Sequence, residues 1–123
     1  MVQQLFEQYQ MSFDALDATK IASLYHLPCA VSDGDGQAVF TSIEQLTEKF
    51  EANCKAMSAM EYSHSEFKIV DEKPMGGAAI GVTIAWKVFT KTSDIQFRAF
   101  YVCHNVAGQW KIFTVQVFQG TFD

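Results

Sequence analysis

The chain has 123 residues, enough for one domain with a single hydrophobic core, and we expect that domain to span residues 1–123. Hydrophobic residues make up 49% of the chain, including 11 Phe, and charged residues only 19%. The net charge of −5 and the single arginine, Arg98, argue against nucleic acid or an acidic membrane surface as a partner, because both require clustered basic side chains.

Three further features narrow the class of protein. The first ten residues lack the basic and apolar regions of a signal peptide, and no stretch approaches the roughly 18 apolar residues of a membrane span. The three cysteines, Cys29, Cys54 and Cys103, have no paired spacing, so we expect free thiols in a cytoplasmic protein. The histidines lack metal-ligand spacing, and we expect neither a metal nor a cofactor.

The first third of the chain has the periodicity of helices. The first helix carries an apolar stripe with steps of three and four residues: Leu5, Phe6, Tyr9, Phe13 and Leu16. Asp17 is a suitable N-cap for a second, shorter helix that carries Ile21, Leu24 and Tyr25. Pro28 is expected to end that helix.

A hairpin is expected next. Two short apolar runs, 29–32 and 37–41, flank the sequence Asp33-Gly34-Asp35-Gly36. An Asp-Gly pair between such runs is a strong signal for a tight turn between antiparallel strands. We therefore predict two strands joined by this turn.

The rest of the chain predicts one more helix and then only strands. Ser42, with Gln45 three residues later, forms a capping box for a helix that reaches about Ala59. Four long strands are expected over residues 62–71, 78–91, 95–105 and 109–119, separated by turn-forming sequences. Helices followed by a meander predict the α+β class, with three helices packed on a curved, mainly antiparallel sheet.

Several of these strands are apolar on both faces. In the last strand, Trp110, Ile112 and Phe118 alternate with Phe113, Val115 and Val117. A sheet with one solvated face would show polar residues at every second position. We therefore expect one face to pack on the helices and the other on a second copy of the chain, which would give a homodimer; scattered exposed apolar residues are the alternative.

The order of elements resembles the NTF2-like superfamily, a cone-shaped α+β fold that includes ketosteroid isomerases and polyketide cyclases of the SnoaL type. The resemblance covers nearly the whole chain, and its local features are "DATKIASLYHLPCAVSD" and "AGQWKIFTVQVF". It implies a deep apolar pocket between sheet and helices, and often a dimer. These features specify a fold far better than a function.

Within this superfamily, ketosteroid isomerases have an aspartate base after the second helix, a tyrosine donor on the first helix and a protonated aspartic acid on a late strand. By alignment on "LY", Asp33 falls at the base and Tyr9 at the tyrosine. Counting back from Gly108, Phe100 occupies the position of the late-strand acid. Because that donor is missing, we expect no true steroid isomerase activity.

Each of these residues also has a structural interpretation. Asp33 is either a proton acceptor at the mouth of the pocket or a turn residue that bonds its own backbone. Tyr9 is either a donor in the pocket or a core residue. Arg98 and Phe100 are predicted on the concave face, where Arg98 would pair with Asp33 or Glu66 or hold an acidic ligand; the alternative is an arginine that extends to solvent at the sheet edge.

We therefore predict a protein that binds a small hydrophobic or weakly acidic molecule, with proton-transfer chemistry of the isomerase, cyclase or dehydratase type as a possible activity. Two alternatives are a binding protein without catalysis and an interaction module whose cone is filled by its own side chains. Beyond Tyr9 and Asp33, the residues predicted to contact the ligand are Phe13, Phe50, Cys54, Met57, Arg98, Phe100, Phe113 and Val115.

Overall fold

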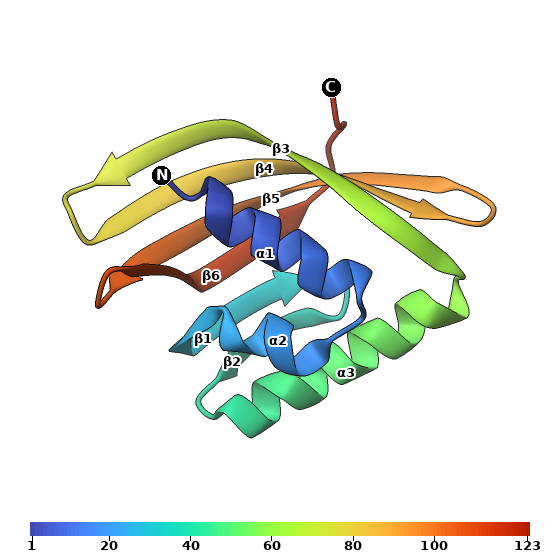
Figure 1. The fold of residues 1–123 in the computed structure, drawn as a ribbon, viewed down its shortest axis with the longest axis horizontal. Helices are drawn as coiled ribbons and strands as arrows, with labels where there is room; N and C mark the ends of the chain where they lie inside the picture. Colours follow the sequence, from blue (N-terminus) through green and yellow to red (C-terminus); the bar gives the residue numbers. More distant parts are fainter.

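A computed structural model describes residues 1–123 and shows three helices against the concave face of one curved, six-stranded sheet (Figure 1). The strand order in the sheet is β2-β1-β6-β5-β4-β3. The elements in chain order are α1 (Gln3–Asp14), α2 (Ala18–Ser23), β1 (Tyr25–Asp33), β2 (Gly36–Phe40), α3 (Ile43–Ala59), β3 (Tyr62–Met75), β4 (Ala79–Thr90), β5 (Asp94–Val106) and β6 (Gln109–Phe118). The predicted α+β class is confirmed. None of the helices combines the length and the apolar content that a membrane crossing requires.

Both predicted helix caps are present. The Asp17 carboxylate accepts the backbone N–H of Lys20 at 3.1 Å at the start of α2. The Ser42 hydroxyl accepts the backbone N–H of Gln45 at 3.2 Å at the start of α3. These bonds satisfy N–H groups that have no partner inside the helix, so each helix begins where the sequence indicates.

The second helix ends earlier than predicted, and Tyr25 belongs to a strand. Tyr25 is the first residue of β1 and pairs in parallel with Ile112 of β6. The backbone N–H of Ile112 also donates to the carbonyl of Leu24 at 2.9 Å. The prediction that Tyr25 is helical was wrong, because pairing with a strand almost 90 residues later starts β1 before Pro28.

The β1–β2 hairpin forms as predicted. Asp33 pairs with Gly36, so Gly34 and Asp35 make a two-residue turn. Gly36 has a φ of +113°, a backbone conformation that residues other than glycine rarely adopt. The Asp33 carboxylate accepts the N–H of Asp35 at 3.0 Å, which is the turn role foreseen for it.

The faces of β5 are reversed relative to the prediction. Ala99, Tyr101 and Cys103 are buried against the helices, so Arg98 and Phe100 lie on the outer face. Phe100 is 38% exposed, and Arg98 is half-buried beside the C-terminal segment. The predicted placement of both residues on the concave face was wrong by one position along the strand, and strand alternation converts that offset into the opposite face.

Phe113 is also on the outer face. The register of β5 and β6 shifts between the pairs Val102–Thr114 and Cys103–Ile112, so Phe113 is an extra residue in β6. Its ring stacks on His104, with ring centroids 4.5 Å apart. Strict alternation along the strand predicted Phe113 on the same face as Val115, in contact with the ligand. That prediction was wrong, because the bulge at Phe113 interrupts the alternation.

The hydrophobic core lies between the inner face of the sheet and the helices. Phe6 of α1, Ile21 of α2 and Leu46 of α3 are fully buried there, together with inner residues of β4 to β6. Burial of side chains this size supplies about 1.5–3 kcal/mol each. Some core residues, among them Phe50, Trp86 and Val115, also line a cavity, so the core does not fill the cone completely.

Candidate functional site

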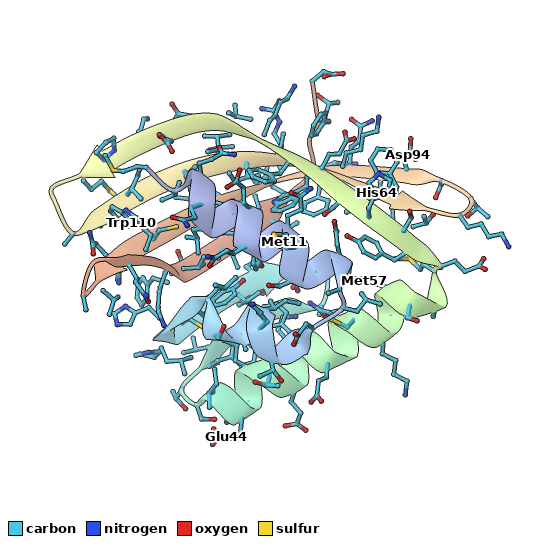
Figure 2. All side chains as sticks on the ribbon, viewed as in Figure 1. Met11, Glu44, Met57, His64, Asp94 and Trp110 are labelled. Carbon is cyan, nitrogen blue, oxygen red and sulfur yellow. The ribbon has the colours of Figure 1, made fainter.

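A cavity of about 520 Å³ lies between α1, α3 and the inner face of the sheet. Seventeen of its 22 lining residues are hydrophobic, and Figure 2 places Met57 on the side of α3 that faces the sheet. The lining includes six residues predicted from the sequence: Tyr9, Phe13, Asp33, Phe50, Met57 and Val115. A cone filled by its own side chains is therefore not what the structure shows.

The other four predicted ligand contacts lie outside this cavity. Cys54 is buried and lines a separate depression beside α2. Arg98 donates from Nε to the carbonyl of Thr121 at 2.8 Å, so it cannot orient an acidic ligand within the cone. Phe100 and Phe113 lie on the outer face, as described above.

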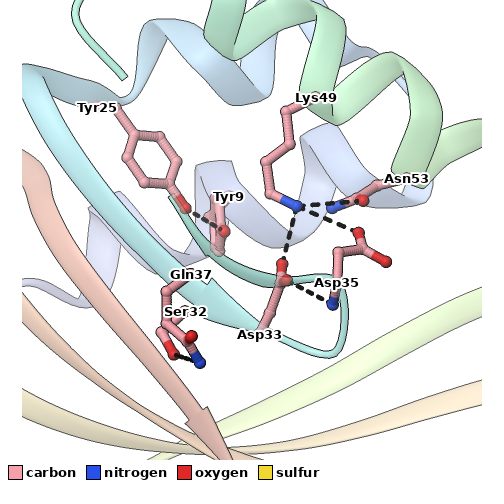
Figure 3. Close-up of polar contacts among 8 residues, drawn as sticks. All are labelled: Tyr9, Tyr25, Ser32, Asp33, Asp35, Gln37, Lys49 and Asn53. Atoms are coloured by element: carbon pink, nitrogen blue, oxygen red, sulfur yellow. Dashed lines mark hydrogen bonds and ion pairs between the residues drawn. The ribbon is translucent and has the colours of Figure 1, made fainter. Parts of the chain in front are cut away.

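At the mouth of the cavity, Asp33 is paired with a lysine that the sequence did not single out. The ammonium group of Lys49 in α3 lies 3.0 Å from Asp33 Oδ2 (Figure 3). The same group contacts Asp35 Oδ2 at 3.3 Å and Asn53 Oδ1 at 3.5 Å. The side chains of Lys49 and Asp33 are only 13% and 18% exposed. We refer to Asp33, Asp35, Lys49 and Asn53 as the rim cluster.

The rim cluster changes what Asp33 can do. One carboxylate oxygen accepts the turn N–H of Asp35 and the other faces the Lys49 ammonium. Both carboxylate oxygens are therefore occupied, and a ligand would have to displace the Asp35 N–H or the Lys49 ammonium to contact Asp33. Asp33 therefore combines the turn role and the cavity-lining role that the sequence left as alternatives.

Deeper in the cavity, Tyr9 of α1 and Tyr25 of β1 form a hydrogen bond between their hydroxyl groups, 2.7 Å apart (Figure 3). Both side chains are buried and line the cavity. Burial raises the pKa of both hydroxyl groups well above the ordinary value. Tyr25 raises the pKa of Tyr9 further, and Tyr101 raises that of Tyr25, whereas the hydrogen bond with Tyr9 partly lowers the pKa of Tyr25. Both groups are therefore protonated at neutral pH.

A second polar pair lies beside the first one. The indole N–H of Trp86 in β4 donates to the hydroxyl of Tyr101 in β5 at 2.9 Å. The rings of Tyr9 and Tyr101 are 6.1 Å apart between centroids, so the two pairs are neighbours. Burial raises the pKa of Tyr101, and the nearby Tyr9 raises it further. We refer to Tyr9, Tyr25, Trp86 and Tyr101 as the aromatic cluster.

A third polar group ties α1 to β3 beside the cavity. One oxygen of Asp14 accepts the hydroxyl of Tyr62, the backbone N–H of Ser65 at 3.1 Å and the Ser65 hydroxyl at 2.9 Å. Tyr62 and Ser65 line the cavity. Because Asp14 satisfies both of them, this part of the wall has no free donor for a ligand.

Sequence reasoning missed Lys49, Tyr25, Trp86 and Tyr101 as site residues. Lys49 lies on the polar side of a helical pattern, where lysine is ordinarily exposed. Trp86 and Tyr101 stand in strands that are apolar on both faces, so alternation could not assign them to the cavity. One signal was available, since a buried tyrosine or tryptophan needs a hydrogen-bond partner.

A cone-shaped α+β fold with an apolar pocket between sheet and helices defines a protein of the NTF2-like class. Residues 1–119 match the family described as NTF2-like protein (DUF6841), and the chain belongs to that family. No curated protein sequence matches the chain.

Solved structures support the same fold at low sequence identity. An NTF2-like protein of unknown function from Shewanella oneidensis has a TM-score of 0.78 and 11% identity, with 94% of each chain covered. A ketosteroid isomerase-like protein from Erwinia carotovora atroseptica has a TM-score of 0.76 and 12% identity over 94% of this chain and 91% of that chain. A domain of unknown function with a cystatin-like fold from Nostoc punctiforme has a TM-score of 0.79 and 9% identity over 97% and 75%.

Proposed function

We propose that this protein binds a small, mostly hydrophobic molecule in the cavity between the sheet and the helices. The single observation that supports this proposal is the cavity itself, about 520 Å³ with a mainly hydrophobic lining. Ligand pockets in proteins have volumes of roughly 300–1,000 Å³ and combine apolar walls with a few polar groups. The aromatic cluster and the rim cluster supply such polar groups at two depths.

Binding is better supported than catalysis. A proton transfer to Asp33 would require the ligand to compete with Lys49 for the carboxylate. The Tyr9 hydroxyl is already hydrogen-bonded to the Tyr25 hydroxyl, so the two groups together have one proton left to donate to a ligand. Proton-transfer chemistry at Asp33 is the second candidate function, supported by the presence of this carboxylate in the cavity wall.

The binding proposal is tested with N-phenyl-1-naphthylamine, a neutral probe that fluoresces in apolar surroundings. Val115→Phe adds an aromatic ring on the inner face, where Val115 lines the cavity. Thr114→Phe adds the same ring one residue earlier, on the outer face. We expect the first change to weaken binding about tenfold or more, since a filled cavity loses the contact area that binds the probe.

The control variant separates this proposal from surface adsorption. Thr114→Phe is expected to leave the dissociation constant within about twofold of the wild-type value, because no binding area is lost. Failure of the wild-type protein to bind the probe or a series of similar apolar molecules would refute the proposal. Equal effects of the two substitutions would place the bound probe outside the cavity.

We further propose that the outer face of the sheet forms a homodimer. Phe100 and Phe118 are 38% and 42% exposed on neighbouring strands, and Met75 is 50% exposed beside Gly81 and Phe100. Half-buried Val102 and Phe113 extend this apolar surface on the same face. A second copy of the same face would cover it in a two-fold arrangement. The mass of the protein in solution tests this second proposal.

A further inference from the structure

The cavity is lined by charged side chains of only one sign. Among its 22 lining residues, Asp33 and Asp35 are negatively charged at neutral pH, and no lysine, arginine or histidine is present. Lys49 contacts Asp33 without lining the cavity, and Arg98 lies on the outer face of the sheet. An anionic ligand would therefore enter an apolar cavity without a counter-charge, which is costly.

The rim cluster carries more negative than positive charge. Lys49 provides one positive charge for the two carboxylates of Asp33 and Asp35, and it also contacts Asn53. These three contacts match the three protons of an ammonium group, so Lys49 has no proton left for another acceptor. The second oxygen of Asp35, Oδ1, has no hydrogen bond or ion pair. Two carboxylates and one ammonium group leave the rim cluster with a formal charge of −1.

The negative charge of Asp33 acts on groups inside the cavity. Burial is the largest cause of the raised pKa of the Tyr9 and Tyr25 hydroxyl groups, and the charge of Asp33 raises the pKa of both further. An electrostatic field that disfavours a negative charge at these positions favours a positive one. The cavity interior is therefore better suited to a cation than to an anion.

Aromatic rings form much of the cavity wall. Eight of the 22 lining residues are Phe, Tyr or Trp. Phe50 directly follows Lys49 in α3. The ring centroid of Phe50 lies 5.3 Å from that of Tyr25 and 5.9 Å from that of Phe13. The faces of aromatic rings carry partial negative charge and attract cations. The wall and the rim cluster therefore favour the same sign of ligand charge.

We propose that the cavity binds an apolar amine in its protonated form, with the hydrocarbon part between the aromatic walls and the ammonium group beside the unpaired oxygen of Asp35. This inference rests on the proposed binding function and names the ligand class for that cavity. The Asp35 side chain is 73% exposed, so the ammonium group keeps part of its hydration and its desolvation costs little. The apolar part of the ligand is enclosed, whereas its charge stays at the mouth.

Three matched probes test the ligand class: 2-naphthylmethylamine, 2-naphthalenemethanol and 2-naphthoate, which share one ring system and carry a positive, a neutral and a negative group. Their dissociation constants are measured by titration calorimetry at neutral pH, where the amine is protonated. We expect the wild-type protein to bind the amine about fivefold more tightly than the alcohol, and the naphthoate most weakly. Equal binding of amine and alcohol, or a preference for naphthoate, would overturn the proposed ligand class.

Two substitutions in the rim cluster are expected to change the preference for amine over alcohol in opposite directions. Asp35→Asn removes the unpaired carboxylate oxygen while Asn-Gly still forms the turn, so the preference should fall to about twofold or less. Lys49→Met leaves the rim cluster with a formal charge of −2, so the preference should increase about threefold. Each preference is a ratio within one variant, so a fraction of unfolded protein does not alter it. A lower preference in Lys49→Met would contradict the proposal.

Asp71→Asn is the matched control for net charge, because Asp71 is exposed on β3 and does not line the cavity. This variant is expected to keep the wild-type preference for the amine. A reduction equal to that in Asp35→Asn would mean that the overall charge of the protein, not the rim cluster, attracts the amine, and the proposal would be wrong.

Val115→Phe shows whether the amine enters the cavity. Because the added ring fills the space beside Val115, we expect amine binding to weaken about tenfold or more. Unchanged amine binding would place the amine on the surface and overturn the proposal. Binding of the alcohol without any preference for the amine would overturn the ligand class while the binding function stands. Failure of all three probes to bind the wild type would refute the binding function and the ligand class together.

Discussion

The ammonium group of Lys49 lies 3.0 Å from the carboxylate of Asp33 and joins the middle of α3 to the tip of the β1–β2 hairpin. The two side chains are 13% and 18% exposed, so solvent screens this ion pair less than it screens a surface pair. Asp33, Asp35 and Asn53 all line the cavity mouth. The ion pair therefore holds the rim of the candidate site in place.

Lys49→Met is expected to lower the free energy of unfolding by about 1–2 kcal/mol, because it leaves a partly buried carboxylate without its counter-charge. The measurement is urea unfolding, with Lys55→Met as control, since Lys55 is exposed on the same helix. Combining Lys49→Met with Asp33→Asn is expected to cost less than the sum of the two single changes. Additive effects would show that the contact contributes nothing to stability.

Alkaline pH is expected to destabilise the protein through its buried tyrosines. The structure raises the pKa of all four tyrosines above 10, chiefly by burial, and raises the pKa of Cys29 to about 11 and of Cys103 to about 12. Above pH about 8 for the thiols and about 9 for the phenols, the unfolded chain releases these protons while the folded protein keeps them, so the free energy of unfolding falls as the pH rises. Below pH about 7.5 these groups are protonated in both states and contribute no pH dependence to stability.

Tyrosinate absorbance at 295 nm checks this expectation. Because every tyrosine has a raised pKa, the absorbance should increase together with the loss of circular dichroism, at a pH above 10. Tyrosinate that forms near pH 10 in a protein with unchanged circular dichroism would contradict the burial and hydrogen bonding of these hydroxyl groups.

Most of the fold followed from local sequence signals. The Asp17 and Ser42 caps and the Asp-Gly turn satisfy backbone groups within a few residues, so they could be predicted before any tertiary contact was known. Tyr25 could not be placed in this way. Its strand conformation depends on pairing with Ile112, a partner that only the folded chain brings near.

The candidate site was predictable only where it depends on helix periodicity. The stripes of α1 and α3 place Tyr9, Phe13, Phe50 and Met57 in the cavity wall, as expected. On the strands, a shift of one residue reverses the face, and this reversal removed Arg98, Phe100 and Phe113 from the cavity. The same reversal brought Tyr101 into it.

Asp14→Ala is expected to lower the free energy of unfolding by about 2–4 kcal/mol. Asp14 accepts three hydrogen bonds from Tyr62 and Ser65, and its removal leaves these donors without their acceptor between α1 and β3. Glu7→Ala is the control, because Glu7 is exposed on α1 and its bond to Gln3 is a surface contact. A cost of Asp14→Ala no greater than that of Glu7→Ala would show that these bonds do not stabilise the wall of the cavity.

Phe100→Lys is expected to convert the proposed dimer into a monomer. Phe100 is 38% exposed on the outer face, where it pairs with Thr83 and Gln116 and its ring lies over Gly81, so a charge there would be buried without a partner in a two-fold interface. Met11→Lys is the matched control, because Met11 is 68% exposed on α1, away from that face (Figure 2). Light scattering should give twice the mass of one chain for the wild type and Met11→Lys, and the mass of one chain for Phe100→Lys. A wild-type protein with the mass of one chain at all concentrations would exclude the dimer, and an unchanged mass for Phe100→Lys would place its contact elsewhere.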